Sequence, residues 1–228
     1  MFRRSSMGNK YNPQNGETVL AIGRIDVFPR DGVYQLYVNM LIPQGAGDLM
    51  QAYERLKAKL QEEGLFDNNR KQEIPVNPLS IGVVTSPIGA AVRDIITVSR
   101  RRNPGIKIYL YPVKVQGDGA SAEIVKAIQF FNKEKLADVL IFGRGGGSIE
   151  DLWAFNEEIV ALAIARSEIP VISAVGHETD VTICDFVADR RVPTPSAAAE
   201  IAVYDISLIL GQLEHYQRKI KLAMNQKL

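Results

Sequence analysis

The sequence contains a single cysteine, Cys184, and no long apolar run. One cysteine excludes a disulfide within the chain and is compatible with a reducing compartment. No stretch approaches the roughly 18 consecutive apolar residues of a membrane-spanning helix, and the N-terminal MFRRSSMGNK lacks the apolar centre of a signal peptide. We therefore expect a cytoplasmic protein that makes no use of a membrane.

Neither sign of charge is in excess. The chain has 27 Lys and Arg against 26 Asp and Glu, which gives a formal net charge of +1. Domains that bind nucleic acids through their overall charge are usually strongly basic, so any anion-binding site has to be local here. The 228 residues, 46% of them hydrophobic, suffice for one large domain or for a smaller domain with an appendage.

The N-terminal part predicts a β segment followed by a helix. TVLAIGRIDVF and GVYQLYVNML alternate apolar and polar residues, and PRDG connects them as a hairpin would. Apolar residues then recur at helical spacing from Leu49 to Leu60, with Asp48 as the expected N-cap and Gly64 just past the helix. The polar, proline-containing FDNNRKQEIPVNP predicts a linker that ends near Asn77.

From Leu79 onward, short apolar runs alternate with helical segments. The expected strands are SIGVVT, IKIYLYPV, ADVLIF and PVISAV, and the expected helices are AAVRDIITVSRR, AEIVKAIQFFNK, DLWAFNEEIVALAIA and DVTICDFVAD. This alternation predicts an α/β fold, a parallel sheet with helices on both faces. Thr194 is the expected cap of a further helix with Pro195 at its first position, and spaced apolar residues predict a long helix that runs up to Leu228.

Four strand-to-helix loops meet at the carboxyl edge of such a sheet, where ligands bind in open α/β folds. They are TSPIGAAVRD (85–94), VQGDGAS (115–121), GRGGGSIEDLW (143–153) and GHETDVTICD (176–185). Two of them, VQGDGAS and GRGGGSIEDLW, contain glycine pairs or triplets beside an expected helix start, where free backbone N–H groups favour an anion such as phosphate.

GRGGGS is the strongest candidate among these loops. Gly145, Gly146 and Gly147 let the backbone approach a ligand, Arg144 supplies a forked cation suited to phosphate, and Ser148 with Asp151 resembles a capping box that marks a helix start. We expect Gly145 to Ser148 to line a phosphate or DNA site. The alternative is a tight turn without a ligand. The spacing fits neither the dinucleotide fingerprint nor the P-loop, which disfavours a kinase or NTPase.

His177 is the side chain best suited to proton transfer near neutral pH, with Asp180 or Glu178 to orient it. Asp94, from the first helix of the α/β segment, could reach the same cleft. Structural roles are the alternatives, because a lone histidine is more often structural and an acid beside Arg93 is more often a surface pair. A divalent-metal site formed by His177, Asp180 and Asp94 also stays open at this stage.

Other polar and aromatic residues have two interpretations each. The arginines 100–102 predict a solvated helix end, with contact to a nucleic-acid backbone as the minority interpretation. Trp153, Tyr34 and Tyr37 fit either packing or base stacking. Asp185 and Asp189 are expected to be solvated or to lie at helix ends.

Taken in order along the chain, GVVTSPIGAAVRDI, PVKVQGDGA, GRGGGSIEDLWAFNEE and PVISAVGHETDVTICDFVADRRVPTPSAAAE closely resemble the large subunit of bacterial exodeoxyribonuclease VII. The resemblance implies degradation of single-stranded DNA from either end to short oligonucleotides, in complex with several copies of a small helical subunit. It assigns the functional residues to Asp94 in AAVRD, Arg144 in GRGGGS, and His177 and Asp180 in GHETD. It also implies activity without an added divalent metal, so no cofactor is expected.

The resemblance also divides the chain into segments. Residues 1–44 resemble the C-terminal part of an OB-fold, residues 45–77 a connecting helix and linker, residues 78–200 the catalytic domain, and residues 201–228 the start of a long partner-binding helix. Two rival hypotheses remain: an α/β module that binds a nucleotide or phosphorylated metabolite without cleaving DNA, and an assembly scaffold whose long helix recruits other chains.

Overall fold

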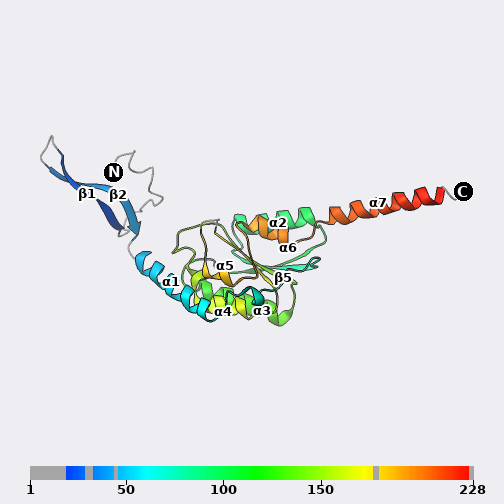
Figure 1. Ribbon diagram of the computed structural model, residues 1–228, viewed down its shortest axis with the longest axis horizontal. Coiled ribbons are helices and arrows are strands. Elements are labelled where there is room, and N and C mark those ends of the chain that lie inside the picture. Colours follow the sequence, from blue (N-terminus) through cyan, green and yellow to red (C-terminus); the bar gives the residue numbers. More distant parts are fainter. Residues whose placement is uncertain (1–18, 29–32, 44–45, 177–179, 226–228) are drawn as a thin grey trace. The chain divides into compact units, whose positions relative to one another are not determined.

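The structure is a computed structural model that describes residues 19–28, 33–43, 46–176 and 180–225 (Figure 1). The chain divides into two compact units, Met1–Arg55 and Leu56–Leu228. The boundary falls inside helix α1 (Ala46–Glu62), so that the β segment belongs to the first unit and the whole α/β segment to the second.

The first unit contains an antiparallel pair of strands, β1 (Val19–Phe28) and β2 (Val33–Pro43). The predicted pairing is confirmed, whereas the PRDG connection lies outside the described residues. A break in register between Ile22 and Gly23 bends the pair as a β-bulge does. Ile25 and Tyr34 are 73% and 77% exposed. Two strands with exposed apolar side chains do not make a stable sheet alone, which is compatible with their being part of a larger barrel. The OB-fold assignment of residues 1–44 stays a prediction.

The end of α1 is fixed by local hydrogen bonds, as predicted. Gly64 N donates to Gln61 O and Leu65 N donates to Leu60 O, both at 3.0 Å. This is the Schellman pattern, and the buried side chains of Leu60 and Leu65 provide its apolar contact. The predicted N-cap at Asp48 is wrong, because α1 already begins at Ala46 and the intervening small residues continue the helical backbone.

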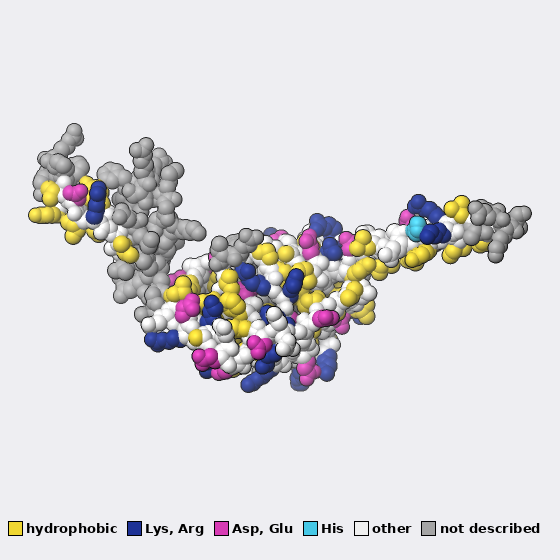
Figure 2. All heavy atoms as spheres, viewed as in Figure 1, with side chains coloured by type: hydrophobic (Ala, Val, Ile, Leu, Met, Phe, Trp, Pro, Cys, Tyr) yellow, Lys and Arg dark blue, Asp and Glu magenta, His cyan; other side chains and the backbone are white. Residues whose placement is uncertain are grey.

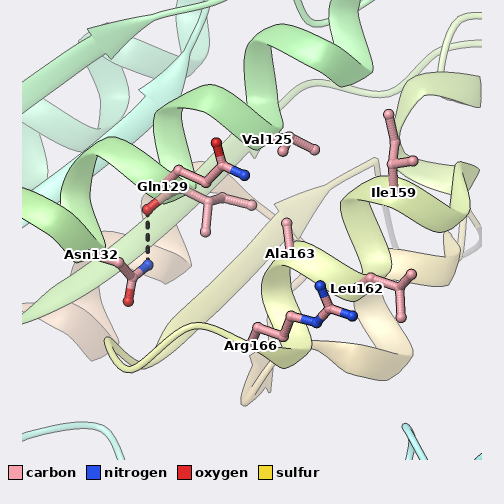
Figure 3. Close-up of a pocket in the computed structure, with 8 residues that line it drawn as sticks. Val125, Gln129, Asn132, Ile159, Leu162, Ala163 and Arg166 are labelled. Carbon is pink, nitrogen blue, oxygen red and sulfur yellow. Dashed lines mark hydrogen bonds between the residues drawn. The ribbon is translucent and has the colours of Figure 1, made fainter.

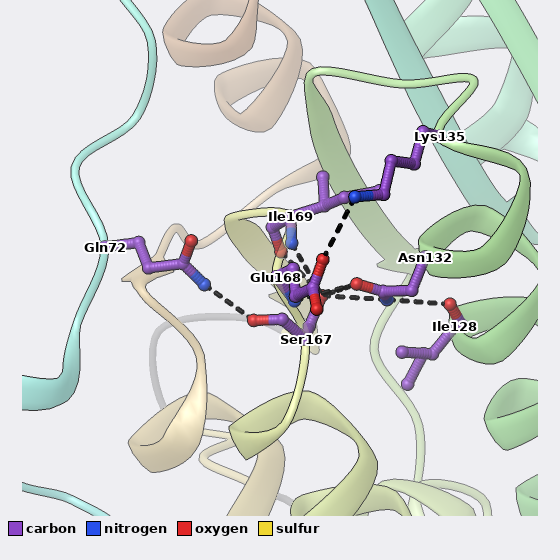
Figure 4. Close-up of polar contacts among 7 residues, drawn as sticks. All are labelled: Gln72, Ile128, Asn132, Lys135, Ser167, Glu168 and Ile169. Carbon is purple, nitrogen blue, oxygen red and sulfur yellow. Dashed lines mark hydrogen bonds and ion pairs between the residues drawn. The ribbon is translucent and has the colours of Figure 1, made fainter.

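The predicted linker is anchored to the second unit. It contains a short 3₁₀ helix, η1 (Asn68–Arg70), and then extended chain. Gln72 Nε2 donates to Ser167 O at 2.7 Å, and Asn132 Nδ2 donates to Ser167 Oγ at 3.1 Å (Figure 4). Glu168 N in turn donates to Asn132 Oδ1 at 2.7 Å, so one polar cluster joins the linker to two parts of the α/β unit.

The second unit is built on a parallel sheet of five strands, which confirms the predicted fold class. The strands are β3 (Ser80–Thr85), β4 (Lys107–Pro112), β5 (Val139–Arg144), β6 (Val171–Val175) and β7 (Arg190–Arg191), in the spatial order β4-β3-β5-β6-β7. All residues of β3, β5 and β6 are buried, which explains their nearly continuous apolar sequences. The two-residue edge strand β7 was not predicted.

Helices cover both faces of the sheet (Figure 1). On one face lie α2 (Ala90–Arg102) and α6 (Pro195–Ala202), and on the other lie α3 (Ala120–Glu134) and α4 (Glu158–Ala165). The core on the α2 and α6 side is assembled from alternate strand residues and small helix residues, among them Ile81, Val83, Ile95, Ile141, Ala198 and Ala202. Burial of these side chains stabilises the unit by about 25 cal/mol for each Å² removed from water.

Two predicted helices are shorter than their sequences indicated. DLWAFNEEIVALAIA forms a 3₁₀ helix, η2 (Trp153–Asn156), before α4, because Glu157 adopts an extended backbone (φ −84°, ψ 137°). DVTICDFVAD forms only α5 (Ile183–Val187), because Ala188 is extended (φ −58°, ψ 149°) and turns the chain into β7. Trp153 is half-buried, which leaves both of its interpretations open.

The junction of α6 with α7 (Ile206–Asn225) is tied to α2 by arginine. Arg102 Nε donates to Val203 O at 2.9 Å, and its Nη1 lies 3.8 Å from Asp205 Oδ2. Asp205 precedes α7 and accepts hydrogen bonds from Ser207, which lower the pKa of Asp205. Of the three arginines at the end of α2, Arg102 is therefore an anchor, while the other two are exposed as predicted.

The N-terminus of α6 forms as predicted, with Thr194 Oγ1 accepting from Ala197 N at 3.1 Å and Pro195 in the first turn. Contrary to expectation, one 28-residue segment, Pro195–Leu222, is long and apolar enough to cross a membrane by length and composition. It is divided between two helices, however, and α6 buries Ala198 and Ala202 against the sheet. The exposed apolar side chains lie along α7 (Figure 2) and include Leu208, Leu210, Leu213, Tyr216, Ile220 and Leu222.

Asp189 provides a test of the contacts that close the amino edge of the sheet. Contrary to the expectation of a solvated residue, its Oδ2 accepts from Val171 N at 2.6 Å and its Oδ1 accepts from Gln72 N at 2.7 Å. We expect Asp189→Ala to lower the free energy of unfolding by about 2–4 kcal/mol, because two backbone donors lose a charged acceptor. Urea denaturation measures this loss. Asp118→Ala is the matched control and should change stability by less than about 0.5 kcal/mol.

Candidate active site

The strand order places a topological switch point at the carboxyl edge of the sheet. The loop after β3 (residues 86–89) leads to α2 on one face, whereas the loop after the neighbouring β5 (residues 145–152) leads to η2 and α4 on the other. A switch point of this kind is the usual ligand site of open α/β sheets. Thr85 Oγ1 donates to Gly143 O at 2.5 Å and holds the two strand ends together beneath it.

Arg144 is the last residue of β5, and its side chain is almost fully buried, with 9% exposed. Nη1 donates to Asp151 O and, at 3.4 Å, to Val115 O, while Nη2 donates to Gln116 Oε1 at 2.7 Å. Nη2 also lies 3.8 Å from Asp151 Oδ1. Burial lowers the pKa of Arg144, and Asp151 opposes that shift. Arginine remains protonated in proteins near neutral pH, so the guanidinium stays charged.

The acceptors of Arg144 come from two different loops. Val115 and Gln116 follow β4, whereas Asp151 follows β5, and the sheet order places β3 between these strands. The side chain therefore joins the two loops across the end of β3. Arg144 is thus held at the switch point rather than extended freely into solvent.

The glycine loop allows this arrangement. A Cβ atom on Gly147 would lie 2.9 Å from Asp151 Cβ and 3.0 Å from Arg144 Nη2, so a larger residue would push the guanidinium away. Gly145 is exposed with open space where a Cβ would stand, and Gly146 is half-buried. The glycines therefore serve two purposes, which are close approach at Gly147 and an open surface at Gly145.

The predicted capping contacts between Ser148 and Asp151 form, but they do not start a helix. Ser148 N and Oγ each lie 3.2 Å from Asp151 Oδ2, and Asp151 N donates to Ser148 Oγ at 3.3 Å. They close a single turn, and α4 begins only at Glu158. The prediction that a helix dipole favours an anion at this loop is therefore wrong. The dipole effect is confined to the first turn of a helix, and no helix starts at Ser148.

Asp180 lies over the end of β6, next to the end of β5. Gly176 N donates to Arg144 O at 3.2 Å, and Gly176 has a left-handed backbone with φ +74°. A Cβ on Gly176 would stand 2.7 Å from Asp180 Cβ and 2.8 Å from Asp180 O. Asp180 therefore lies at the strand end that adjoins Arg144. His177 and Glu178, between these two residues, lie outside the described residues.

Asp94 lies one turn into α2 and is exposed. The neighbouring Ala91 and Ile95 face Gly143 of β5, which places this part of α2 beside the strand that ends in Arg144. Within the described residues, Asp94 makes no hydrogen bond or ion pair, so the alternative of a surface pair with Arg93 does not form. The structure does not bring its carboxylate into contact with Arg144 or Asp180.

A buried polar cluster behind these loops was not predicted. Asp185 is 4% exposed, which contradicts the expectation of a solvated side chain although it does lie at the start of α5. Ser173 Oγ donates to its Oδ1 at 2.6 Å, and Thr182 N and Oγ1 donate to its Oδ2 at 2.7 and 2.9 Å. Burial raises the pKa of Asp185, and these hydrogen bonds oppose the shift. The spacing of Thr182 and Asp185 is a capping-box signal that sequence reasoning missed.

Asn156, the last residue of η2, connects that 3₁₀ helix to the start of α5, since its Oδ1 accepts from Ile183 N at 2.8 Å. Within the described ranges no three His, Cys, Asp or Glu side chains gather as a metal site requires. The metal alternative includes His177, so it stays an untested prediction.

The structure also has a shallow groove of about 310 Å³ away from the carboxyl edge (Figure 3). Its lining side chains belong to α3 and α4 and none comes from the four loops: Val125, Ile128, Gln129, Asn132, Ile159, Leu162, Ala163 and Arg166. The groove is mostly apolar and holds no group suited to proton transfer, so the candidate site is the carboxyl edge.

An open parallel sheet with a buried arginine at its switch in strand order is typical of an α/β ligand-binding or catalytic domain. The family model "Exonuclease VII, large subunit" matches residues 65–228. The chain belongs to this family.

Curated relatives support the assignment over the whole chain. The chain is 56% identical over 227 residues to the "Exodeoxyribonuclease 7 large subunit" of Ruminiclostridium cellulolyticum, covering 100% of this chain and 56% of the relative. Proteins of the same name from Syntrophotalea carbinolica and Clostridium botulinum are 53% and 51% identical over 100% and 98% of this chain. The chain spans 56–57% of the length of these relatives.

Gly176→Ala tests the close contact between Gly176 and Asp180. We expect a loss of about 2–5 kcal/mol in the free energy of unfolding, because the new Cβ combines left-handed strain with a clash against Asp180. Gly117→Ala is the matched control, since Gly117 has a similar φ of +77° and open space around it. It should lose only about 1 kcal/mol. Equal losses in urea denaturation would show that Asp180 does not pack on Gly176.

The raised pKa of Asp185 predicts how stability depends on pH. Between its unfolded and folded pKa values the native state binds the additional proton, so this contribution is present at low pH and is lost as pH rises through the folded pKa. We expect wild type to lose stability relative to Asp185→Asn as pH rises from about 4 to neutrality, because the amide does not titrate. Parallel unfolding curves at several pH values measure the difference, and a pH-independent difference would contradict the raised pKa.

Proposed function

We propose that this chain is the catalytic part of a large subunit that hydrolyses phosphodiester bonds of single-stranded DNA from either end to short oligonucleotides. Two facts support the proposal. The chain belongs to the exonuclease VII large-subunit family, and its relatives are named as exodeoxyribonuclease 7 large subunits. The structural observation that carries it is the charged guanidinium of Arg144, held at the strand-order switch of the sheet.

Arg144 would bind the scissile phosphate and stabilise the charge that develops on its non-bridging oxygens. A fixed cation in a partly dry site stabilises such charge more strongly than the same cation in water. The open backbone at Gly145 lets a nucleotide phosphate approach this edge, and Gly146, Gly147 and Ser148 would line the same site. Arg144 and this loop thus form the binding half of the proposed site.

His177, Asp180 and Asp94 supply the proton transfers in this proposal. Water attacks phosphorus, the bond to one bridging ester oxygen breaks, and the proton lost by water is balanced by a proton gained at the leaving oxygen. His177 acts as the general base or the general acid, and Asp180 orients it. Asp94 is the complementary acid–base group or positions the water. No added divalent ion is required in this proposal.

Further parts of the proposal concern partners and compartment. The exposed apolar side chains of α7 offer a surface for several copies of a small helical subunit, as the words "large subunit" in the relatives' names imply a smaller companion. The first unit would contribute to single-strand binding as part of an OB-fold. The single buried cysteine fits a protein that works in the cytoplasm.

The same exposed stripe on α7 favours a second candidate, an assembly scaffold without catalysis. That function predicts that replacing Arg144 leaves partner binding unchanged. A phosphate-binding module would instead bind nucleotides through Arg144 without cleaving DNA.

The test is degradation of end-labelled single-stranded and duplex DNA, in EDTA and in magnesium, by the chain co-purified with a small-subunit partner. We expect single strands to be cleaved in EDTA. Arg144→Ala should reduce kcat by about 10²–10³-fold, because it removes a preorganised charge from the transition state. His177→Ala should reduce it by about 10²–10⁴-fold.

Arg100→Ala is the matched control, because Arg100 is exposed at the far end of α2 and bonds only Pro104 O within the described residues. It should retain wild-type turnover. Equal activity of Arg144→Ala and Arg100→Ala would refute the role of Arg144. The binding module would be favoured if the chain bound nucleotides but did not cleave DNA, and if a chain extended to the length of the relatives behaved in the same way.

A further inference from the structure

The side chain of Gln116 makes the best-formed side-chain hydrogen bond to Arg144. Arg144 Nη2 donates to Gln116 Oε1 at 2.7 Å, whereas the contact of Nη1 with Val115 O is 3.4 Å long. Asp151 Oδ1, at 3.8 Å from Nη2, is beyond hydrogen-bond distance. The direction of Nη2 is therefore set chiefly by an amide 28 residues away in the sequence.

Gln116 is exposed, and the loop around it is held by other contacts. Val113 N donates to Thr85 O at 3.1 Å, and Lys114 N donates to Glu123 Oε2 at 2.7 Å. These bonds fix the loop to β3 and α3 without the amide of Gln116. Loss of that amide should therefore free Nη2, while Nη1 keeps its hydrogen bond to Asp151 O, and should leave the loop in place.

The neutrality of Gln116 matters for binding an anion. An amide oxygen orients the guanidinium but leaves its positive charge uncompensated, whereas a carboxylate at the same distance would neutralise it. The one carboxylate close to Arg144 in the described residues, that of Asp151, already forms an ion pair with Nη2 at 3.8 Å. The amide of Gln116 adds orientation without adding a second negative charge beside the guanidinium.

We propose that Gln116 is a positioning residue, which orients the guanidinium of Arg144 toward the phosphodiester of DNA. This inference rests on the proposed function, in which Arg144 stabilises the transition state. A misdirected guanidinium still attracts DNA at long range but loses alignment with the reacting phosphate, so its effect falls mainly on kcat.

The first measurement concerns orientation and needs no DNA. In protein labelled with ¹⁵N-arginine, the Nη resonances of Arg144 are assigned by their disappearance in Arg144→Lys. In wild type, a guanidinium fixed by hydrogen bonds should give separate Nη signals. Gln116→Ala should merge or broaden them, Gln116→Glu should keep them separate, and the matched control Gln129→Ala, on the exposed side of α3, should leave them unchanged.

The second measurement is turnover of single-stranded DNA by wild type, Gln116→Ala, Gln116→Glu and Gln129→Ala, each in complex with the small-subunit partner. We expect Gln116→Ala to lower kcat by about tenfold or more, the size of a lost hydrogen bond to a charged group, with less change in KM. Gln116→Glu should instead raise KM by about tenfold, because the guanidinium stays oriented but is neutralised. Thermal unfolding of all variants should match wild type.

The two measurements separate the possible failures. Unchanged Nη signals in Gln116→Ala would overturn the inference whatever the activity of the chain. Altered signals with wild-type kcat would also overturn it, because the orientation would then have no catalytic use. Absence of cleavage by wild type would refute the proposed function instead, and would be recognised before any variant is compared.

Discussion

Burial of a positive charge at the end of β5 is the constraint on which the carboxyl edge depends. The guanidinium of Arg144 is 9% exposed, so its N–H groups require acceptors inside the protein. The loops after β4 and β5 supply them, and Gly147 must lack a side chain for Asp151 to come close enough. The backbone of Arg144 also accepts the hydrogen bond from Gly176 that begins the next loop. One buried residue thereby fixes the relative position of three loops.

The sequence predicted those parts of the fold that local interactions determine. The strands were recognisable because parallel strands buried on both faces are almost entirely apolar. The end of α1 at Gly64 and the start of α6 at Thr194 were predictable because their capping groups are neighbours in sequence. The division of η2 from α4 was not, because it accompanies a contact from Asn156 to a residue 27 positions away. Likewise, β7 pairs with β6 only through the folded sheet.

The candidate site likewise has features that local sequence predicts and features that depend on distant contacts. The position of Arg144 beyond a buried strand follows from local sequence, but its partner Gln116 belongs to a different strand-to-helix unit. Asp185 was misjudged because an acid next to polar residues looks solvated, whereas Ser173 from β6 and a local cap satisfy it in the interior. Which side chains become buried is decided when strands assemble, and a linear pattern does not contain that information.

The polarity of parallel strands explains why carboxylates accept backbone hydrogen bonds at the amino edge while the buried arginine lies at the carboxyl edge. At the amino edge, strands begin with free N–H donors, and carboxylates bind them: Asp138 accepts from Leu79 N and Ser80 N, and Asp189 accepts from Val171 N. At the carboxyl edge the chain leaves the sheet with carbonyl groups, which suit a cation. Arg144 binds the carbonyl of Asp151 there, and because carbonyls are neutral its charge persists. A local cation at one edge therefore follows from strand direction, and it is this edge that an anionic substrate would approach.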